Sequence, residues 1–248
     1  MVVPSLPGYG WSGKPTGTGW SVQRTADAWA SLMTVLGYES FGAQGGDWGA
    51  IVSTHLAARH PERVLGLHLN LVYGEPPHGR QDFDARERRA LAAQRHYRRD
   101  GSAYARQQAS RPQTLGYGLA DSPAGQCAWI LEKFGAWSDC EDDPVRTFGA
   151  DRLLDNISTY WFSSTATSSA RLYWESLRTS YAGADTVSVP TGVSLFPKDI
   201  YLPTREWAAT RYIDLRMWHE LGEGGHFAAF ERPELFVREV REFFRDVR

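Results

Sequence analysis

The sequence predicts an α/β fold, with a mostly parallel sheet interrupted by a helical insertion. Short apolar runs alternate with helical patterns over residues 1–72 and again from residue 186 to the end of the chain. Over residues 73–185 strand signal is weak, and several stretches have helical spacing. We therefore expect a sheet domain made of residues 1–72 and 186–248, and a helical cap over 73–185, inserted after the third strand visible in the sequence.

The first 72 residues contain the opening strands and helices of the expected sheet. Short apolar runs bounded by Pro or Gly are typical of buried strands, and apolar residues three and four apart are typical of helices. The expected elements are a strand over Val2–Leu6, a helix over Val22–Leu36 closed by Gly37, a strand ending at Ala43, a helix over Ile51–Arg59 and a strand over Val64–Val72.

The cap is expected to be helical, and strands return after it. The Arg-rich stretch from Asp84 to Arg99 has acidic residues among the arginines, which indicates a solvated helix rather than a nucleic-acid face. The other expected elements are cap helices over Gly125–Phe134 and Leu153–Phe162, strands over Val187–Leu195 and Asp214–Trp218, and helices over Arg205–Thr210 and Pro233–Phe244.

The composition is that of a soluble globular protein. Among 248 residues, 42% are hydrophobic and 23% charged, and a net charge of −2 gives no reason to expect nucleic acid or an anionic membrane as partner. No apolar run has the length of a membrane span, and no signal peptide is visible. Cys127 and Cys140 lack metal or redox spacing, so we expect unpaired thiols and a cytoplasmic protein.

The stretch Gln44–Ala50 is typical of a nucleophile elbow, a sharp turn between a strand and a helix. Gly45 and Gly49 flank its central residue and relieve steric conflict in a strained turn. The central residue, usually Ser, is Asp47 here. A carboxylate nucleophile forms an ester by attacking saturated carbon, which points away from peptide or simple ester hydrolysis. The alternative is a Gly-rich turn in which Asp47 only caps the helix.

A carboxylate nucleophile needs a base to hydrolyse its ester, and a third group to orient that base. Asp47, Asp199 and His226 follow one another in the order nucleophile, acid, histidine, each just past an expected strand. The carboxyl ends of parallel strands meet at one edge of a sheet, where ligand sites lie. Alternatively, Asp199 caps a helix near Pro203, and His219 is the likeliest other base.

Several motifs resemble those of a known family. The chain resembles the microsomal-type epoxide hydrolases, which include juvenile-hormone epoxide hydrolases and many bacterial relatives. These enzymes have the α/β-hydrolase fold with a helical cap, and the resemblance runs from residue 2 to the C-terminus. The matching segments are Val3–Gly10, Gln44–Gly49, Asp121–Gly125, Ile130–Phe134, Phe196–Ile200 and Gly224–Glu231.

The resemblance implies a role for each matching residue. Asp47 is the nucleophile, His226 the base and Asp199 the orienting acid, while the backbone N–H of Trp48 donates to the oxyanion. In the cap, Tyr173 is the proton donor and Tyr104 hydrogen-bonds to the epoxide oxygen. The implied substrates are a small apolar epoxide and water. No metal or organic cofactor is required, and a homodimer is a further expectation.

The chain also departs from the family. Family members have a long N-terminal region with three core strands and a His-Gly-x-Pro loop, and nothing in this sequence corresponds to it. We expect an N-terminally truncated sheet with an unpaired interior edge and only one oxyanion donor, hence poor stability and weak activity. Two other functions stay open: a haloalkane dehalogenase, which also uses an Asp nucleophile on this fold, and a non-catalytic binding remnant.

Overall fold

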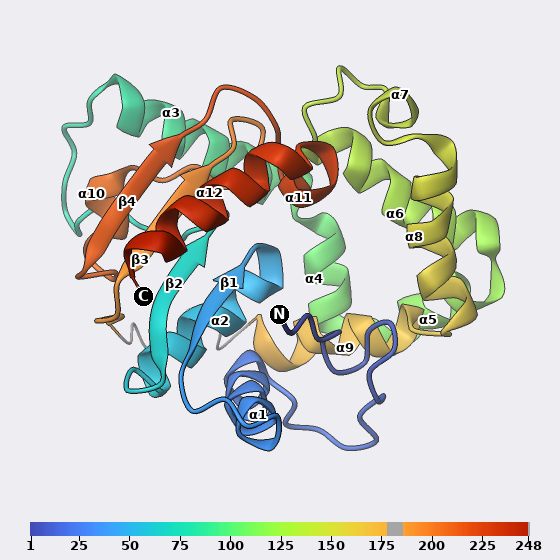
Figure 1. Cartoon of the computed structure of the whole chain (residues 1–248). Helices are drawn as coiled ribbons and strands as arrows, with labels where there is room; N and C mark the ends of the chain where they lie inside the picture. Colours follow the sequence, from blue (N-terminus) through green and yellow to red (C-terminus); the bar gives the residue numbers. More distant parts are fainter. Residues whose placement is uncertain (178–185, 248) are drawn as a thin grey trace. The chain divides into compact units, whose positions relative to one another are not determined.

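The structure is a computed structural model that describes residues 1–177 and 186–247 (Figure 1). The chain forms two compact units. The sheet unit contains Ala26–Gly101 and Ala184–Arg248, and the helical unit contains Met1–Thr25 and Ser102–Gly183. Helix α1 (Val22–Val35) begins in the helical unit and continues in the sheet unit, and Gly37 with φ +81° follows it.

The sheet has four strands in the order β1-β2-β3-β4, and every pair is parallel. Their bounds are β1 Phe41–Gly45, β2 Val64–Leu69, β3 Thr191–Leu195 and β4 Leu215–Glu220. Central strand β3 is buried along its whole length, which explains its apolar sequence without polar alternation. The predicted α/β class with a parallel sheet is confirmed.

Helices cover both faces of this sheet. Figure 1 shows α12 in front of the strands and α2 behind them. The Phe243 ring of α12 lies where a Cβ on Gly192 would be, 2.4 Å from it, so a glycine in β3 lets this helix pack closely. The helices of the sheet unit after α1 are α2 Asp47–Arg59, α3 Ala85–His96, the π-helix η1 Tyr97–Gly101, α10 Arg205–Ala208, α11 Ala228–Glu231 and α12 Pro233–Asp246.

The helical unit is built from short helices, and proline or a capping residue marks the N-terminus of several of them. Pro112, Pro123 and Pro144 each begin a helix, where a missing N–H costs nothing. The side chain of Ser122 accepts a hydrogen bond from Gly125 N at 3.0 Å and caps α6. The helices are α4 Ala103–Ser110, α5 Pro112–Asp121, α6 Pro123–Trp137, α7 Pro144–Phe148, α8 Ala150–Phe162 and α9 Ala166–Ser176.

The strand predicted over Val2–Leu6 is wrong. These residues form no strand, and Val3 is 80% exposed. A strand exists only when a neighbour completes its hydrogen-bond ladder. Residues 1–25 belong to the helical unit, whose other described elements are helices and offer no ladder. Without that strand, the helices α3 to α9 follow β2, which is the second strand of the described structure and not the third. The predicted domain boundaries at 72/73 and 185/186 stay a prediction.

Candidate active site

The glycine-rich turn between β1 and α2 holds Asp47 in the left-handed region, with φ +48°. This conformation costs a non-glycine residue on the order of 1–3 kcal/mol, and such strain clusters at functional sites. The glycines around it have no positive φ; they provide space. A Cβ on Gly45 would lie 2.2 Å from the carbonyl oxygen of Gly49, so the turn can close only with glycine at position 45.

Asp47, His226 and Asp199 are joined by hydrogen bonds, although they are far apart in the chain. His226 Nε2 lies 2.9 Å from Asp47 Oδ2, and His226 Nδ1 lies 2.7 Å from Asp199 Oδ1. The three residues follow β1, β4 and β3, so they meet at the carboxyl edge of the sheet. His226 and Asp199 are buried, whereas the Asp47 side chain is 40% exposed and accessible to a reactant.

The structure also shows where the residues named in the alternative interpretations lie. Helix α2 has Gly46 at its N-cap with no side-chain cap, so Asp47 does not cap it. Thr204, rather than Asp199, caps α10. His219 Nδ1 pairs with Glu239 at 2.7 Å in the interface of β4 and α12. The sheet unit therefore places His226, and not His219, beside Asp47.

His226 and the two aspartates stabilise one another's charged forms. Burial pushes the pKa of His226 down, but the negative charge of Asp199, and then that of Asp47, outweighs burial and raises it to about 10. Desolvation pushes the pKa of Asp47 up, but the hydrogen bond and charge of His226 outweigh it and lower the pKa. At neutral pH the resting site therefore holds an imidazolium beside an ionised Asp47.

The two oxygens of Asp47 are not equivalent. The backbone N–H of Trp48 donates to Oδ1 at 2.6 Å, while Oδ2 lies against His226. Oδ1 thus already accepts a hydrogen bond from a backbone N–H that could stabilise an oxyanion. Oδ2 is the oxygen close to which His226 Nε2 can donate or accept a proton.

In the helical unit, Tyr104 and Tyr173 lie together on α4 and α9. Their rings meet edge to face, with centroids 5.8 Å apart. The Lys133 ammonium lies 4.6 Å from the Tyr104 ring centroid and 5.2 Å from that of Trp137. The sequence prediction thus selected two tyrosines that are neighbours in the fold.

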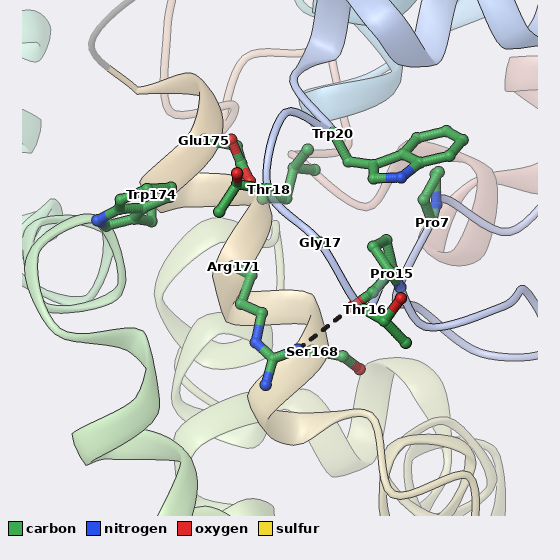
Figure 2. Close-up of a pocket in the computed structure, with 11 residues that line it drawn as sticks. Pro7, Pro15, Thr16, Gly17, Thr18, Trp20, Ser168, Arg171, Trp174 and Glu175 are labelled. Atoms are coloured by element: carbon green, nitrogen blue, oxygen red, sulfur yellow. Dashed lines mark hydrogen bonds between the residues drawn. The ribbon is translucent and has the colours of Figure 1, made fainter.

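The helical unit also has a pocket of about 290 Å³ between the segment 7–20 and helix α9. Figure 2 shows Arg171 and Glu175 on the helix and Thr16 and Thr18 on the segment facing it. Arg171 donates to the carbonyl of Pro15 at 3.5 Å. Neither Tyr104 nor Tyr173 is among the residues that line this pocket.

One cluster of the described residues has metal-ligand chemistry. His219, Glu239 and Glu242 each place a ligand atom within 4.8 Å of the others. Glu239 Oε2, however, already pairs with His219 and accepts a hydrogen bond from Ser194 Oγ at 3.1 Å. These bonds explain the cluster as a tether between α12 and the sheet.

Comparison with known proteins gives a consistent result. A family model described as alpha/beta hydrolase fold matches residues 1–122. The chain is 49% identical to the "Putative epoxide hydrolase" of Stigmatella aurantiaca (strain DW4/3-1), over 100% of this chain and 56% of that protein. It is 36% identical to epoxide hydrolase 1 of Oryctolagus cuniculus, over 98% of this chain and 59% of that protein.

Solved structures agree. The juvenile hormone epoxide hydrolase of the silkworm Bombyx mori matches with TM-score 0.88 and 29% identity, over 98% of this chain and 63% of that one. The Aspergillus niger epoxide hydrolase matches with TM-score 0.87 and 32% identity, over 99% of this chain and 63% of that one.

These matches define the chain as a protein of the α/β-hydrolase fold. Within that fold, the resemblance to microsomal and juvenile-hormone epoxide hydrolases that the motifs predict is confirmed. The chain spans between 56% and 59% of the length of these curated relatives. In the part of the chain that the structure describes, no helix is long and apolar enough to cross a membrane.

Two residues that touch the site were not singled out from the sequence. Asn70, at the end of β2, lies against the elbow: a Cβ on Gly46 would be 2.6 Å from its amide nitrogen. Glu231 accepts hydrogen bonds from the loop that carries His226. For Asn70 the sequence carries no signal. Glu231 lies inside a matching motif, which was the one available hint.

Proposed function

We propose that this chain carries the reaction of an epoxide hydrolase: addition of water to a small apolar epoxide, giving a vicinal diol through an ester on Asp47. The observation that carries the proposal is the hydrogen-bonded series Asp47–His226–Asp199, with a carboxylate at the elbow. The similarity to epoxide hydrolases supports the choice of substrate.

The first half of the proposed reaction is alkylation of Asp47. Oδ2 attacks one ring carbon, the carbon–oxygen bond to the epoxide oxygen breaks, and that oxygen takes a proton. Tyr173 is the proposed donor, and Tyr104 the second hydrogen-bond donor, as the family resemblance implies. A phenol suits this role because it remains protonated at neutral pH. The product of this half is a glycol ester of Asp47.

The second half is hydrolysis of that ester. His226 takes a proton from water, and the hydroxide attacks the carboxyl carbon of Asp47. Negative charge develops on Oδ1, which the Trp48 N–H already contacts at 2.6 Å. The intermediate collapses, the diol oxygen leaves with the proton from His226, and the proton of the new Asp47 carboxyl restores the tyrosine through solvent. One epoxide and one water give one diol.

Ester formation itself prepares His226 to act as a base. In the resting site Asp199 and Asp47 together raise the pKa of His226 to about 10, so the imidazole is protonated. Conversion of Asp47 to a neutral ester removes one of these two charges. The pKa of His226 then falls, and the imidazole can release its proton to solvent and accept another from water. It takes a proton back from solvent when Asp47 is again a carboxylate.

A single-turnover experiment in H2(18)O with an aryl epoxide tests the proposal. Water that attacks the ester places the label in Asp47, and the first diol released contains none. Replacement His226→Gln should trap the ester, seen by mass spectrometry as an adduct on the peptide with Asp47, because general-base catalysis is worth about 10²–10⁴-fold. Asp47→Ala is the control and should form no adduct.

Two results would contradict the proposal. Label found directly in the first diol would mean that water attacks the ring without an ester. Undiminished turnover by Asp47→Ala would remove the nucleophile. A haloalkane supplied in place of the epoxide checks the neighbouring chemistry, and halide release without any diol formation from epoxides would favour a dehalogenase.

A further inference from the structure

Glu231 is a buried acid beside the proposed base, and the mechanism above does not use it. It is the last residue of α11 and is 7% exposed. Its Oε1 accepts a hydrogen bond from Gly225 N at 2.9 Å and another from Phe227 N at 3.2 Å. The residue between these two donors is His226. One carboxylate oxygen therefore holds the backbone on both sides of the histidine.

Two other contacts also hold the histidine loop. On its N-terminal side Lys198 N donates to Gly224 O at 3.1 Å, and Gly224 has φ +93°. Farther out, Arg232 pairs with Glu223 at 2.7 Å, but both side chains are partly exposed. Exposed pairs contribute about 0–1 kcal/mol, whereas loss of the acceptor for a buried N–H costs about 1–3 kcal/mol. The Glu231 bonds are thus a stronger constraint on the loop than the exposed pair of Arg232 with Glu223.

We propose that Glu231 is a positioning residue for the base: it fixes the backbone around His226 so that Nε2 stays directed at Asp47. The inference rests on the proposed function, because it assigns Glu231 to the ester-hydrolysis half of that reaction. His226 must direct water at one carbon in this half, so an error of about 1 Å can cost up to about 10²-fold in rate. Alkylation, in which His226 moves no proton, depends on this geometry much less.

Both hydrogen bonds go to the same oxygen, which suggests a pair of informative variants. Glu231→Gln keeps a carbonyl oxygen at the Oε1 position and replaces the carboxyl group by an amide. Glu231→Met has similar length but no acceptor, and removes the acceptor of the buried Gly225 N–H and of the half-buried Phe227 N–H. A positioning role by hydrogen bonding predicts that the Gln variant behaves like the unaltered protein and the Met variant does not.

The measurement is rapid-quench single turnover of an aryl epoxide, with the Asp47 ester quantified by mass spectrometry. In Glu231→Met, ester hydrolysis should slow by about 10- to 10²-fold while alkylation changes little, so the ester accumulates. Glu239→Gln is the matched control: it alters another buried glutamate, on α12, that contacts Ser194 and His219 rather than the His226 loop. It should lower stability without ester accumulation.

Amide hydrogen exchange at Gly225 and Phe227 separates this inference from the proposed function. Both amides should be protected in the unaltered protein and in Glu231→Gln, and exchange faster in Glu231→Met, whether or not an epoxide is turned over. Absence of any Asp47 ester in the unaltered protein would defeat the proposed function. A formed ester that Glu231→Met hydrolyses at the normal rate, or a Gln variant as defective as the Met variant, would overturn the positioning role alone.

Discussion

Asp199 is the residue whose charge most raises the pKa of His226. Its Oδ1 lies 2.7 Å from His226 Nδ1 and also accepts the N–H of Ile200 at 2.6 Å. The second bond fixes the carboxyl group, and the first fixes the imidazole. Orientation and charge therefore come from one buried side chain.

Replacement Asp199→Asn should slow hydrolysis of the Asp47 ester by about 10²–10⁴-fold. The amide carries no charge to stabilise the imidazolium and can present an N–H to Nδ1, which favours the wrong tautomer. Single-turnover kinetics measure the effect as ester accumulation. Equal slowing of alkylation and hydrolysis would show instead that Asp199 acts mainly on the fold.

The tyrosines of the helical unit should affect the other half of the reaction. Tyr173→Phe removes the proposed proton donor and should slow alkylation by about 10²–10⁴-fold, while hydrolysis of an ester already formed stays near its normal rate. Tyr104→Phe should act in the same step and more weakly. The alkylation rate constant from rapid quench decides, and a Phe variant that alkylates normally would exclude that tyrosine.

The strand–turn–helix formed by β1 and α2 is the element that presents the nucleophile. The positive φ falls on Asp47, while Gly45 allows close approach of the backbone on the other side of the turn. A Cβ on Gly49, by contrast, would have no heavy atom within 4 Å. The two glycines of the motif therefore have different structural importance.

Gly45→Ala should destabilise the protein by about 1–3 kcal/mol or more, because overpacking at a backbone atom cannot be relieved by a rotamer change. Gly49→Ala is its control and should be neutral or stabilising by up to about 1 kcal/mol, since it lies within α2. Urea unfolding monitored by circular dichroism measures both. Equal stability of the two variants would contradict this account of the elbow.

In the whole sheet unit, two of the buried histidines, His68 and His226, respond to pH in opposite ways. Burial, followed by the charge of His219, lowers the pKa of His68 to about 4, and the carboxylates raise that of His226 to about 10. His68 Nε2 lies 3.1 Å from Ser194 Oγ, which donates to Glu239, so the neutral His68 is the donor to the serine. This series connects β2, β3 and α12 in the core.

The contribution of these two histidines to the unfolding free energy should be greatest near pH 6.5 and fall on either side. Between pH 6.5 and about pH 4, His68 binds a proton in the unfolded chain but stays neutral in the folded protein. This difference lowers the unfolding free energy by about 3 kcal/mol at pH 4 and below. Above pH 6.5 folded His226 keeps, up to about pH 10, a proton that the unfolded chain releases near 6.5. His68→Gln should flatten the acid side and His226→Gln the alkaline side of the stability profile, measured by urea unfolding. Unchanged slopes in these variants would contradict the assignment.

Much of the fold was predictable because it depends on local pattern. Apolar spacing indicated α1, α6 and α12 to within a few residues, and short apolar runs indicated β2 and β3. The strand at Val2–Leu6 failed because strand formation depends on a partner that local pattern does not reveal. Among the site residues, the order of Asp47, Asp199 and His226 was readable because each follows a strand of one parallel sheet.

Local patterns in the sequence were enough to predict the α/β class, the carboxylate at the elbow and the set of polar residues at strand ends. The packing of the chain was needed to show that His226, the base expected from the sequence, lies 2.9 Å from Asp47 across 179 residues of chain, and that His219 pairs with Glu239 instead. It also decided which oxygen of Asp47 faces the Trp48 N–H, and that Glu231 holds the backbone of the histidine loop. Local pattern records which face of an element is apolar, whereas a hydrogen bond between distant side chains depends on the packing of every element between them.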